Sequence, residues 1–305
     1  MLMTAWGLAF MIPNLFRRLL GEGALTQALI PIIAGVMKNE GEYNARKKIF
    51  PVFIVLGGIL GIICVIFGGI AFFLAPLVTV PRVKYALELT PILMPYSFFI
   101  CLSGVISGIL NLKHQYFIPA LSAVSLNIFM VICLLVIPSA NLQLIEPLLG
   151  LNYLAVAVLL SGAFQLSLLL LLLLKTGMMP VISYMGNLFS EPTVKELFRL
   201  TIPGIIGASL VQISFVIDRS MACYLGDYAV PALNYSDRII DLPIGIFAVA
   251  MGSVFLPTLS HLVAEDDVAG AAKYFHFALR NILFISIPAS IFIVFFRYPL
   301  IKVFY

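Results

Sequence analysis

Charged side chains interrupt the first apolar stretch of the sequence at its centre. Arg17, Arg18 and Glu22 separate two apolar runs, residues 1–16 and 24–36. Neither run alone comfortably reaches the roughly 20 residues that cross a bilayer, so we expect one long or broken helix whose charged centre lies at membrane depth. A charge at that depth costs several kcal/mol unless it faces a bundle interior or a wet cavity. The pattern therefore predicts a polar cavity with a basic floor.

The spacing of these residues gives the two arginines different expected roles. Arg18 and Glu22 are four residues apart, so on a helix they can neutralise each other. Arg17 points about 100° away and has no acidic residue one turn before or after it, so we expect it to face an anionic ligand. Gly21 and Gly23 flank Glu22 and can allow a bend or a close helix approach. The alternative is that both arginines extend to the headgroup surface.

A second set of charges lies in two later apolar spans. Asp218 and Arg219 occur in one span, and Asp237, Arg238 and Asp241 occur in the next. Arg238 and Asp241 are three residues apart and can pair on a helix. The alternative to a binding role is that these charges form structural pairs that hold helices together inside a bundle.

The composition restricts the class of protein. Of the 305 residues, 62% are hydrophobic and only 10% are charged, which no ordinary soluble domain shows, and the strict alternation of a membrane barrel is absent. The sequence therefore predicts an all-α polytopic membrane protein. It contains no paired catalytic carboxylates, phosphate loop or metal-ligand cluster, and its basic residues are spread over separate loops. We therefore expect neither an enzyme nor a nucleic-acid-binding protein.

The apolar runs predict about eight transmembrane helices. A more polar, amphipathic stretch, residues 176–197, predicts a linker between an N-terminal lobe of residues 1–175 and the start of a C-terminal lobe of residues 198–305. Basic residues gather in alternate loops, including residues 38–48 and the loop at Lys113, so these loops are predicted to be cytoplasmic. After the opening helix, the expected spans are about 49–80, 86–112, 117–137, 151–174, 198–225, 230–263 and 271–295.

Two parts of the sequence repeat a short pattern. In residues 28–49 and again in residues 254–275, a Leu or Ile followed by Pro ends a span, an acidic loop follows, and a Lys precedes the next span. Both copies begin from the same side of the membrane, so the repeat is parallel, as in two-lobed transporters. A further span precedes the second copy, and three more spans follow the first. Because neither has an equivalent around the other copy, we expect a chain truncated at both ends.

A specific motif surrounds the two arginines. The run from Ile12 to Ala24, Ile-Pro-Asn-Leu-Phe-Arg-Arg-Leu-Leu-Gly-Glu-Gly-Ala, closely resembles the MurJ/MviN family of lipid II flippases, which belongs to the multidrug/oligosaccharidyl-lipid/polysaccharide exporter superfamily. The resemblance extends through Gly108–Asn111, Val211–Ser214 and Tyr235–Arg238 and covers essentially the whole chain. It implies that the eight helices correspond to helices two to nine of a fourteen-helix, two-lobed flippase with a parallel internal repeat.

The resemblance also implies site residues. Arg17 matches the family's cavity arginine on helix two and Arg238 matches the one on helix eight, so both are expected to bind the diphosphate of lipid II. Asp218 falls where some members place a sodium ligand. Coupling to sodium, to protons or to the membrane potential stays open, and no other cofactor is implied. The expected substrate-binding set is Arg17, Arg238, Asn14, Arg18, Glu22 and Asp237.

The function that the resemblance implies is transfer of lipid II, the undecaprenyl-diphosphate-linked disaccharide peptide used in peptidoglycan biosynthesis. Transfer runs from the cytoplasmic to the outer leaflet of the bacterial inner membrane, by alternating access. We expect a monomer whose other partners are membrane lipids. Two alternatives stay open: a related exporter of another polyprenyl-linked saccharide or of a drug, and a non-transporting fragment or scaffold. A drug exporter should show unpaired acids in its cavity, and a scaffold should show Arg17 and Arg238 facing lipid or fully paired.

Overall fold

The computed structural model describes residues 2–21, 24–136, 147–182, 188, 191–226, 228–245, 255, 259 and 267–304. Within these ranges the regular elements are helices, and seven helical stretches are long and apolar enough to cross a membrane. The prediction of an all-α polytopic protein is confirmed. In the predicted span 230–263, residues 246–254, 256–258 and 260–263 lie outside the described residues.

The opening span is a long helical stretch with a π-helical turn at its charged centre, where one long or broken helix was expected. It consists of α1 (Leu2–Phe16), a π-helical turn η1 (Arg17–Gly21) and α2 (Ala24–Glu40). Pro13 lies inside α1, where its missing N–H removes one backbone hydrogen bond just before the break. A π-helical turn is wider than an α-helical one and is frequent at functional sites. The two arginines are the first residues of this turn.

The other helices follow in chain order and fall into two compact units, residues 1–230 and residues 231–305. Each unit is described by itself. The predicted span 117–137 is divided by a turn at Ala123 and Val124 into two helices. The remaining elements are α3 (Glu42–Leu74), η2 (Ala75–Leu77), α4 (Pro81–Leu112), α5 (Phe117–Ser122), α6 (Ser125–Val136), α8 (Pro147–Lys175), α9 (Pro192–Leu225), α10 (Ala229–Pro243), α12 (Val268–Phe295) and α13 (Arg297–Phe304).

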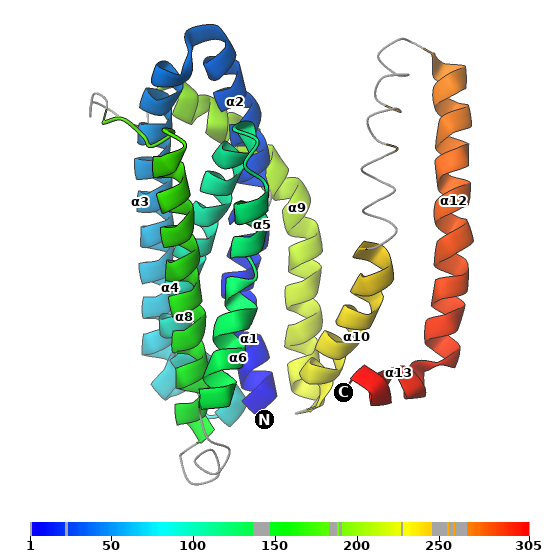
Figure 1. The fold of residues 1–305 in the computed structure, drawn as a ribbon. Coiled ribbons are helices and arrows are strands. Elements are labelled where there is room, and N and C mark those ends of the chain that lie inside the picture. The colour runs from blue at the N-terminus through cyan, green and yellow to red at the C-terminus, as the bar shows by residue number, and fades with distance from the viewer. Residues whose placement is uncertain are drawn as a thin grey trace. The chain divides into compact units, whose positions relative to one another are not determined.

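Helix α4 is the central helix of the first unit. It packs against α8, α3 and α1, with η1 and α2 beside it, and Figure 1 shows α3, α4 and α8 running side by side. Pro81 begins α4 at a position where a missing N–H costs nothing. Leu89, Leu93, Met94 and Ile106 of α4 are fully buried. The opening span therefore packs against a helix that is itself buried in the core of the unit.

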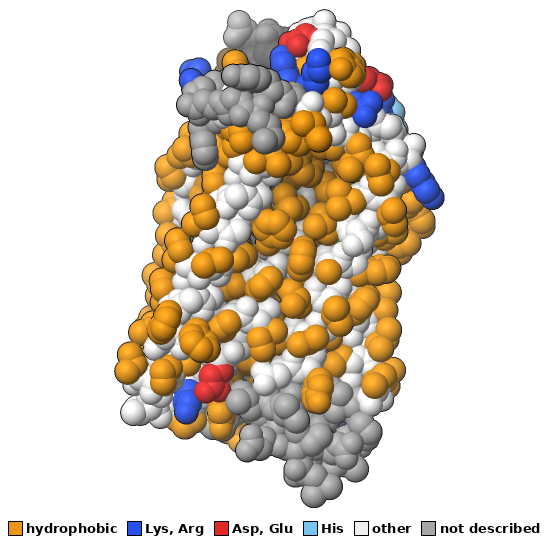
Figure 2. All heavy atoms as spheres, turned by 90° about the vertical axis from the view of Figure 1, so that its left-hand side faces the viewer, with side chains coloured by type: hydrophobic (Ala, Val, Ile, Leu, Met, Phe, Trp, Pro, Cys, Tyr) orange, Lys and Arg blue, Asp and Glu red, His pale blue; other side chains and the backbone are white. Residues whose placement is uncertain are grey.

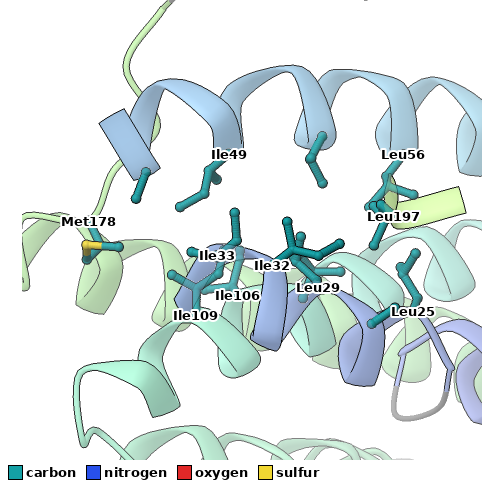
Figure 3. Close-up of a cluster of buried hydrophobic side chains, with 14 of the residues drawn as sticks. Leu25, Leu29, Ile32, Ile33, Ile49, Leu56, Ile106, Ile109, Met178 and Leu197 are labelled. Carbon is teal, nitrogen blue, oxygen red and sulfur yellow. The ribbon is translucent and has the colours of Figure 1, made fainter. Parts of the chain in front are cut away.

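A cluster of buried apolar side chains joins α2, α3, α4 and α9 (Figure 3). Leu29 and Ile33 of α2 meet Ile49 of α3 and Ile106 of α4 in this cluster. Leu197, in the first turns of α9, is buried with them. The start of α9 is therefore fixed against the helices that carry the broken span.

Helix α9 begins inside the stretch predicted as a linker. Its first residue is Pro192, and Thr193 and Val194 are buried in the first unit. The helix then continues without interruption to Leu225. The division into a lobe of residues 1–175, a linker of residues 176–197 and a second lobe stays a prediction.

One end of the first unit gathers charged side chains, while its middle is apolar (Figure 2). Lys48 forms an ion pair with Glu40 at 2.6 Å, and Lys113 pairs with Glu42. The Arg46 Nε donates a hydrogen bond to the carbonyl oxygen of Met179 at 2.8 Å. These contacts bring together the loops after α2, α4 and α8. The distribution of basic residues predicts that these three loops lie on the same side of the membrane.

Candidate functional site

The Arg17 side chain is held by the helix that precedes it. Its Nε donates a hydrogen bond to Oδ1 of Asn14 at 3.0 Å, and both residues are half-buried. Asn14 lies three residues before Arg17, on the same face of the helix. Two members of the expected binding set are therefore in direct contact, and Asn14 holds one edge of the Arg17 guanidinium.

The π-helical turn is positioned by a close backbone contact with α4. A Cβ atom at Gly104 would lie 2.6 Å from the carbonyl carbon of Gly21 and closer still to its oxygen. A Cβ atom at Gly21 would lie 3.3 Å from the Cα of Cys101. The hydroxyl of Thr26 also donates a hydrogen bond to the Gly21 carbonyl oxygen at 2.7 Å. The sequence indicated Gly21 as a point of close approach, and the structure identifies α4 as the helix that approaches.

Gly104 belongs to a pair of small residues on one face of α4. Gly108 follows it by four residues, and a Cβ atom there would lie 2.9 Å from Cγ2 of Thr26. Small residues at this spacing let two membrane helices come close. The pair therefore fixes both η1 and the start of α2 against α4, which determines where Arg17 and Arg18 lie.

Arg18 contacts an aromatic side chain of α9. Its Cζ lies 5.2 Å from the centre of the Phe215 ring, and the Cζ of Arg219 lies 4.8 Å from the same ring centre. Both distances are within the range of a cation–π interaction. Glu22, the partner expected for Arg18, lies outside the described residues.

The sequence did not single out Phe215 as a site residue, and it left open whether Arg219 has a binding role or forms a structural pair. A signal for both was present in the spacing. Phe215 and Arg219 are four residues apart inside an apolar span, so they lie on one face of the helix. What the sequence could not show was that this face meets Arg18.

The second unit carries the other expected set. Asp237 and Arg238 lie on α10, where Asp237 is half-buried and Arg238 is exposed. The spacing of Arg238 and Asp241 permits a pair, but no ion pair within 4.0 Å joins these two described residues. Both side chains are exposed, and an exposed pair gains too little to hold two mobile side chains together. The predicted cooperation of Arg17 with Arg238 stays a prediction.

Asp218, the predicted sodium ligand, is an exposed residue of α9. In the part of the chain that the structure describes, no three His, Cys, Asp or Glu side chains gather into a group suited to a metal ion. A single carboxylate does not define a cation site. The role of Asp218 stays a prediction.

Comparison with known proteins assigns the chain to a family. The family model described as "Lipid II flippase MurJ" matches residues 1–305. The chain belongs to the MurJ family. The resemblance indicated by the arginine motif is thereby confirmed, and MurJ proteins are transporters rather than enzymes.

Curated MurJ relatives match along nearly the whole chain. The lipid II flippase MurJ of Burkholderia cenocepacia is 30% identical over 306 residues, which cover 97% of this chain and 58% of that protein. The probable lipid II flippase MurJ of Rhizobium tropici is 31% identical over 292 residues, covering 93% of this chain and 53% of the relative. The chain thus spans somewhat more than half the length of these relatives.

A solved MurJ structure has the same fold. The lipid II flippase MurJ in its inward closed conformation matches with a TM-score of 0.75 and 22% identity, covering 100% of this chain and 61% of the other. The structural match confirms the prediction that the helices correspond to part of a larger MurJ helix bundle.

Proposed function

We propose that the protein moves lipid II from the cytoplasmic to the outer leaflet of a bacterial inner membrane, in the pathway of peptidoglycan biosynthesis. The observation that carries this proposal is the π-helical turn, which sets Arg17 and Arg18 near the centre of a helical stretch that is long and apolar enough to cross a membrane. Family membership supports the choice of substrate. A turn with two half-buried arginines fits an anionic headgroup, because a charge at membrane depth requires a partner or a cavity.

Arg17 is the proposed first ligand of the diphosphate. Its Nε donates a hydrogen bond to Asn14, and a guanidinium group is planar, with five N–H donors in all. Such a planar fork matches two oxygens of a phosphate, and it stays charged at any physiological pH. Lysine is a poorer replacement, since its ammonium group is a point charge without this geometry.

Arg238 is the proposed second ligand, contributed by α10. We propose that the lobes of residues 1–175 and 198–305 move relative to each other during transport, and that the diphosphate binds to arginines from both. Binding energy shared between two lobes stabilises the conformation in which both contact the ligand. Glu22 and Asp237 would then limit the net charge of the site, and the lipid tail would stay in the membrane.

The anionic ligand also separates this proposal from transport of a drug. A cationic drug would be matched by acidic residues, whereas the broken span places two arginines together in η1. Another polyprenyl-linked saccharide would carry the same diphosphate, so substitution of the arginines does not distinguish it from lipid II. A competition experiment, in which the two lipids compete for binding to the protein, does.

The proposal is tested by lipid II binding and by flipping in vesicles. Arg17→Ala and Arg238→Ala should each reduce flipping by about tenfold or more, since a hydrogen bond to a charged group contributes about 1.5–3 kcal/mol. Arg199→Ala is the matched control, because Arg199 is an exposed arginine on α9. Unchanged flipping in both site variants would refute the diphosphate role.

A further inference from the structure

The Thr26 side chain forms a hydrogen bond of unusual span. Its hydroxyl donates to the carbonyl oxygen of Gly21 at 2.7 Å, five residues earlier in the chain. Inside helices, Ser and Thr hydroxyls ordinarily bond to the carbonyl three or four residues before them. The hydroxyl of Thr90 on α4 bonds to Ala86 in this way, and other described Ser hydroxyls that bond within their own helix do the same. A span of five residues is instead the repeat of π-helical hydrogen bonding.

This bond joins the π-helical turn to the helix that follows it. Gly21 is the last residue of η1, and Thr26 lies in the first turn of α2. The methyl group of Thr26 lies against α4, where a Cβ atom at Gly108 would be 2.9 Å from it. Thr26 is half-buried, and at membrane depth there is no water to take the place of a lost hydroxyl donor. One side chain thus holds η1, α2 and α4 together.

The geometry of η1 decides where its arginines point. Arg17 and Arg18 are the first residues of this turn, and Asn14, which accepts the hydrogen bond of the Arg17 Nε, lies just before it. A π-helical turn contains about one residue more than an α-helical turn. If η1 relaxed to α-helical geometry, the residues before it would therefore rotate by about 100° relative to α2, the angle of one residue. A contact that stabilises the π-helical turn thus also sets the direction of the arginines.

A second side-chain donor contacts the residue just before η1. The Sγ atom of Cys101 on α4 lies 3.5 Å from the carbonyl oxygen of Phe16, and Cys101 is fully buried. A thiol is a weak donor, whereas the hydroxyl of Thr26 is an ordinary one. Side chains therefore hold the turn at both ends, and Thr26 supplies the stronger of the two hydrogen bonds.

We infer that Thr26 is a positioning residue for the anion site, because its hydroxyl stabilises the π-helical turn in which Arg17 and Arg18 face a diphosphate. The inference rests on the proposed function, since it takes the arginines to bind that group. It adds to that function an uncharged residue that sets the affinity for the diphosphate. Thr26 acts through Gly21 rather than by contact with the ligand.

The experiment measures the affinity of the protein in lipid nanodiscs for undecaprenyl diphosphate and for undecaprenol. Undecaprenol has the same lipid tail but no phosphate, so it reports on packing alone. Thr26→Val keeps the branched shape and removes the hydroxyl, and it should weaken binding of the diphosphate lipid by about fivefold, the equivalent of one hydrogen bond. Thr26→Ser keeps the hydroxyl and should retain the original affinity. Undecaprenol binding should be unchanged in both variants.

The matched control is Thr90→Val. It makes the same change at a buried threonine whose hydroxyl bonds within a regular helix at 2.8 Å, so the affinity for the diphosphate lipid should stay unchanged. The number of binding sites per protein is measured together with the affinity, because a protein that is only destabilised loses sites and keeps its affinity. When Thr26→Val is combined with Arg17→Gln, the loss should be smaller than the sum of the two single losses, since both changes act on the same group.

The outcomes separate this inference from the proposed function. If Arg17→Gln weakens binding of the diphosphate lipid and Thr26→Val does not, the inference is wrong and the proposed function stands. If Thr26→Ser binds as weakly as Thr26→Val, the hydroxyl does not carry the effect and the inference is again wrong. If Thr26→Val weakens undecaprenol binding equally, or only lowers the number of binding sites, Thr26 serves only to hold helices together, which also contradicts the inference. If neither Arg17→Gln nor Thr26→Val affects binding, both proposals fail.

Discussion

Replacing Gly104 with alanine should displace the turn that carries the arginines. The new Cβ would lie 2.6 Å from the carbonyl carbon of Gly21, whereas carbon atoms in favourable contact are about 3.5–4.0 Å apart. The obstacle is backbone, not the end of a flexible side chain, so α4 and η1 must separate by about 1 Å. Overpacking of this kind typically costs about 1–3 kcal/mol.

The displacement should affect ligand binding as well as stability. A shift of about 1 Å in a group that positions a ligand can reduce activity by about a hundredfold. We therefore expect Gly104→Ala to lower the temperature of thermal unfolding, followed by Trp6 fluorescence, and to reduce lipid II binding by tenfold or more. Trp6 suits this assay because it stacks on Phe10, with ring centres 5.8 Å apart, within the core beside α4.

The matched control is Gly61→Ala in α3. It makes the same chemical change inside a membrane helix, and nothing lies within 4 Å of the added Cβ. Alanine has the higher helix propensity, by about 1 kcal/mol, so this variant should be as stable as the original or slightly more stable. Equal unfolding temperatures and equal lipid II binding in the two variants would refute the argument that backbone contact with α4 positions η1.

Three further changes have definite expected outcomes. Asn14→Ala removes the acceptor for the Arg17 Nε and should weaken lipid II binding by several-fold with little change in unfolding temperature; an unchanged affinity would show that Asn14 does not orient Arg17. Gly162→Ala would place a Cβ 2.8 Å from Cδ2 of Tyr96. Because a ring can shift more easily than a backbone, the unfolding temperature should fall by less than it does for Gly104→Ala. Lys113→Ala removes the ion pair with Glu42. Because that pair is exposed, the free energy of unfolding should fall by less than about 1 kcal/mol. A larger decrease would indicate that the pair is part of a network.

The break in the first span could be predicted from sequence because its cause is local. Arg17 and Arg18 cannot lie at the centre of an apolar helix without a cavity or a partner. Charged residues and glycines stand next to each other at this point of the sequence, so an irregular turn could be expected there. The π-helical geometry of the turn depends on contact with α4, which the sequence of the turn does not encode. Gly104 carries this contact, and a glycine in an apolar helix does not by itself show which backbone approaches it.

Tertiary contacts also explain what the sequence left open about the second set of charged residues. Arg219 could be assigned to a helix face only once the start of α9 was known to be buried with α2 and α3 through Val194 and Leu197. The spacing of Arg238 and Asp241 permits a pair, but spacing alone does not favour it when both side chains are exposed.

The central claim is that Arg17 and Arg238 bind one diphosphate. The most direct test is a double-mutant cycle, in which lipid II flipping in vesicles is measured for the original protein, Arg17→Ala, Arg238→Ala and the combined variant. Two groups that hold one ligand are expected to be non-additive, so we predict a large loss in each single variant and little further loss in the combination. Unchanged flipping in the single variants, or losses that simply add, would contradict the claim.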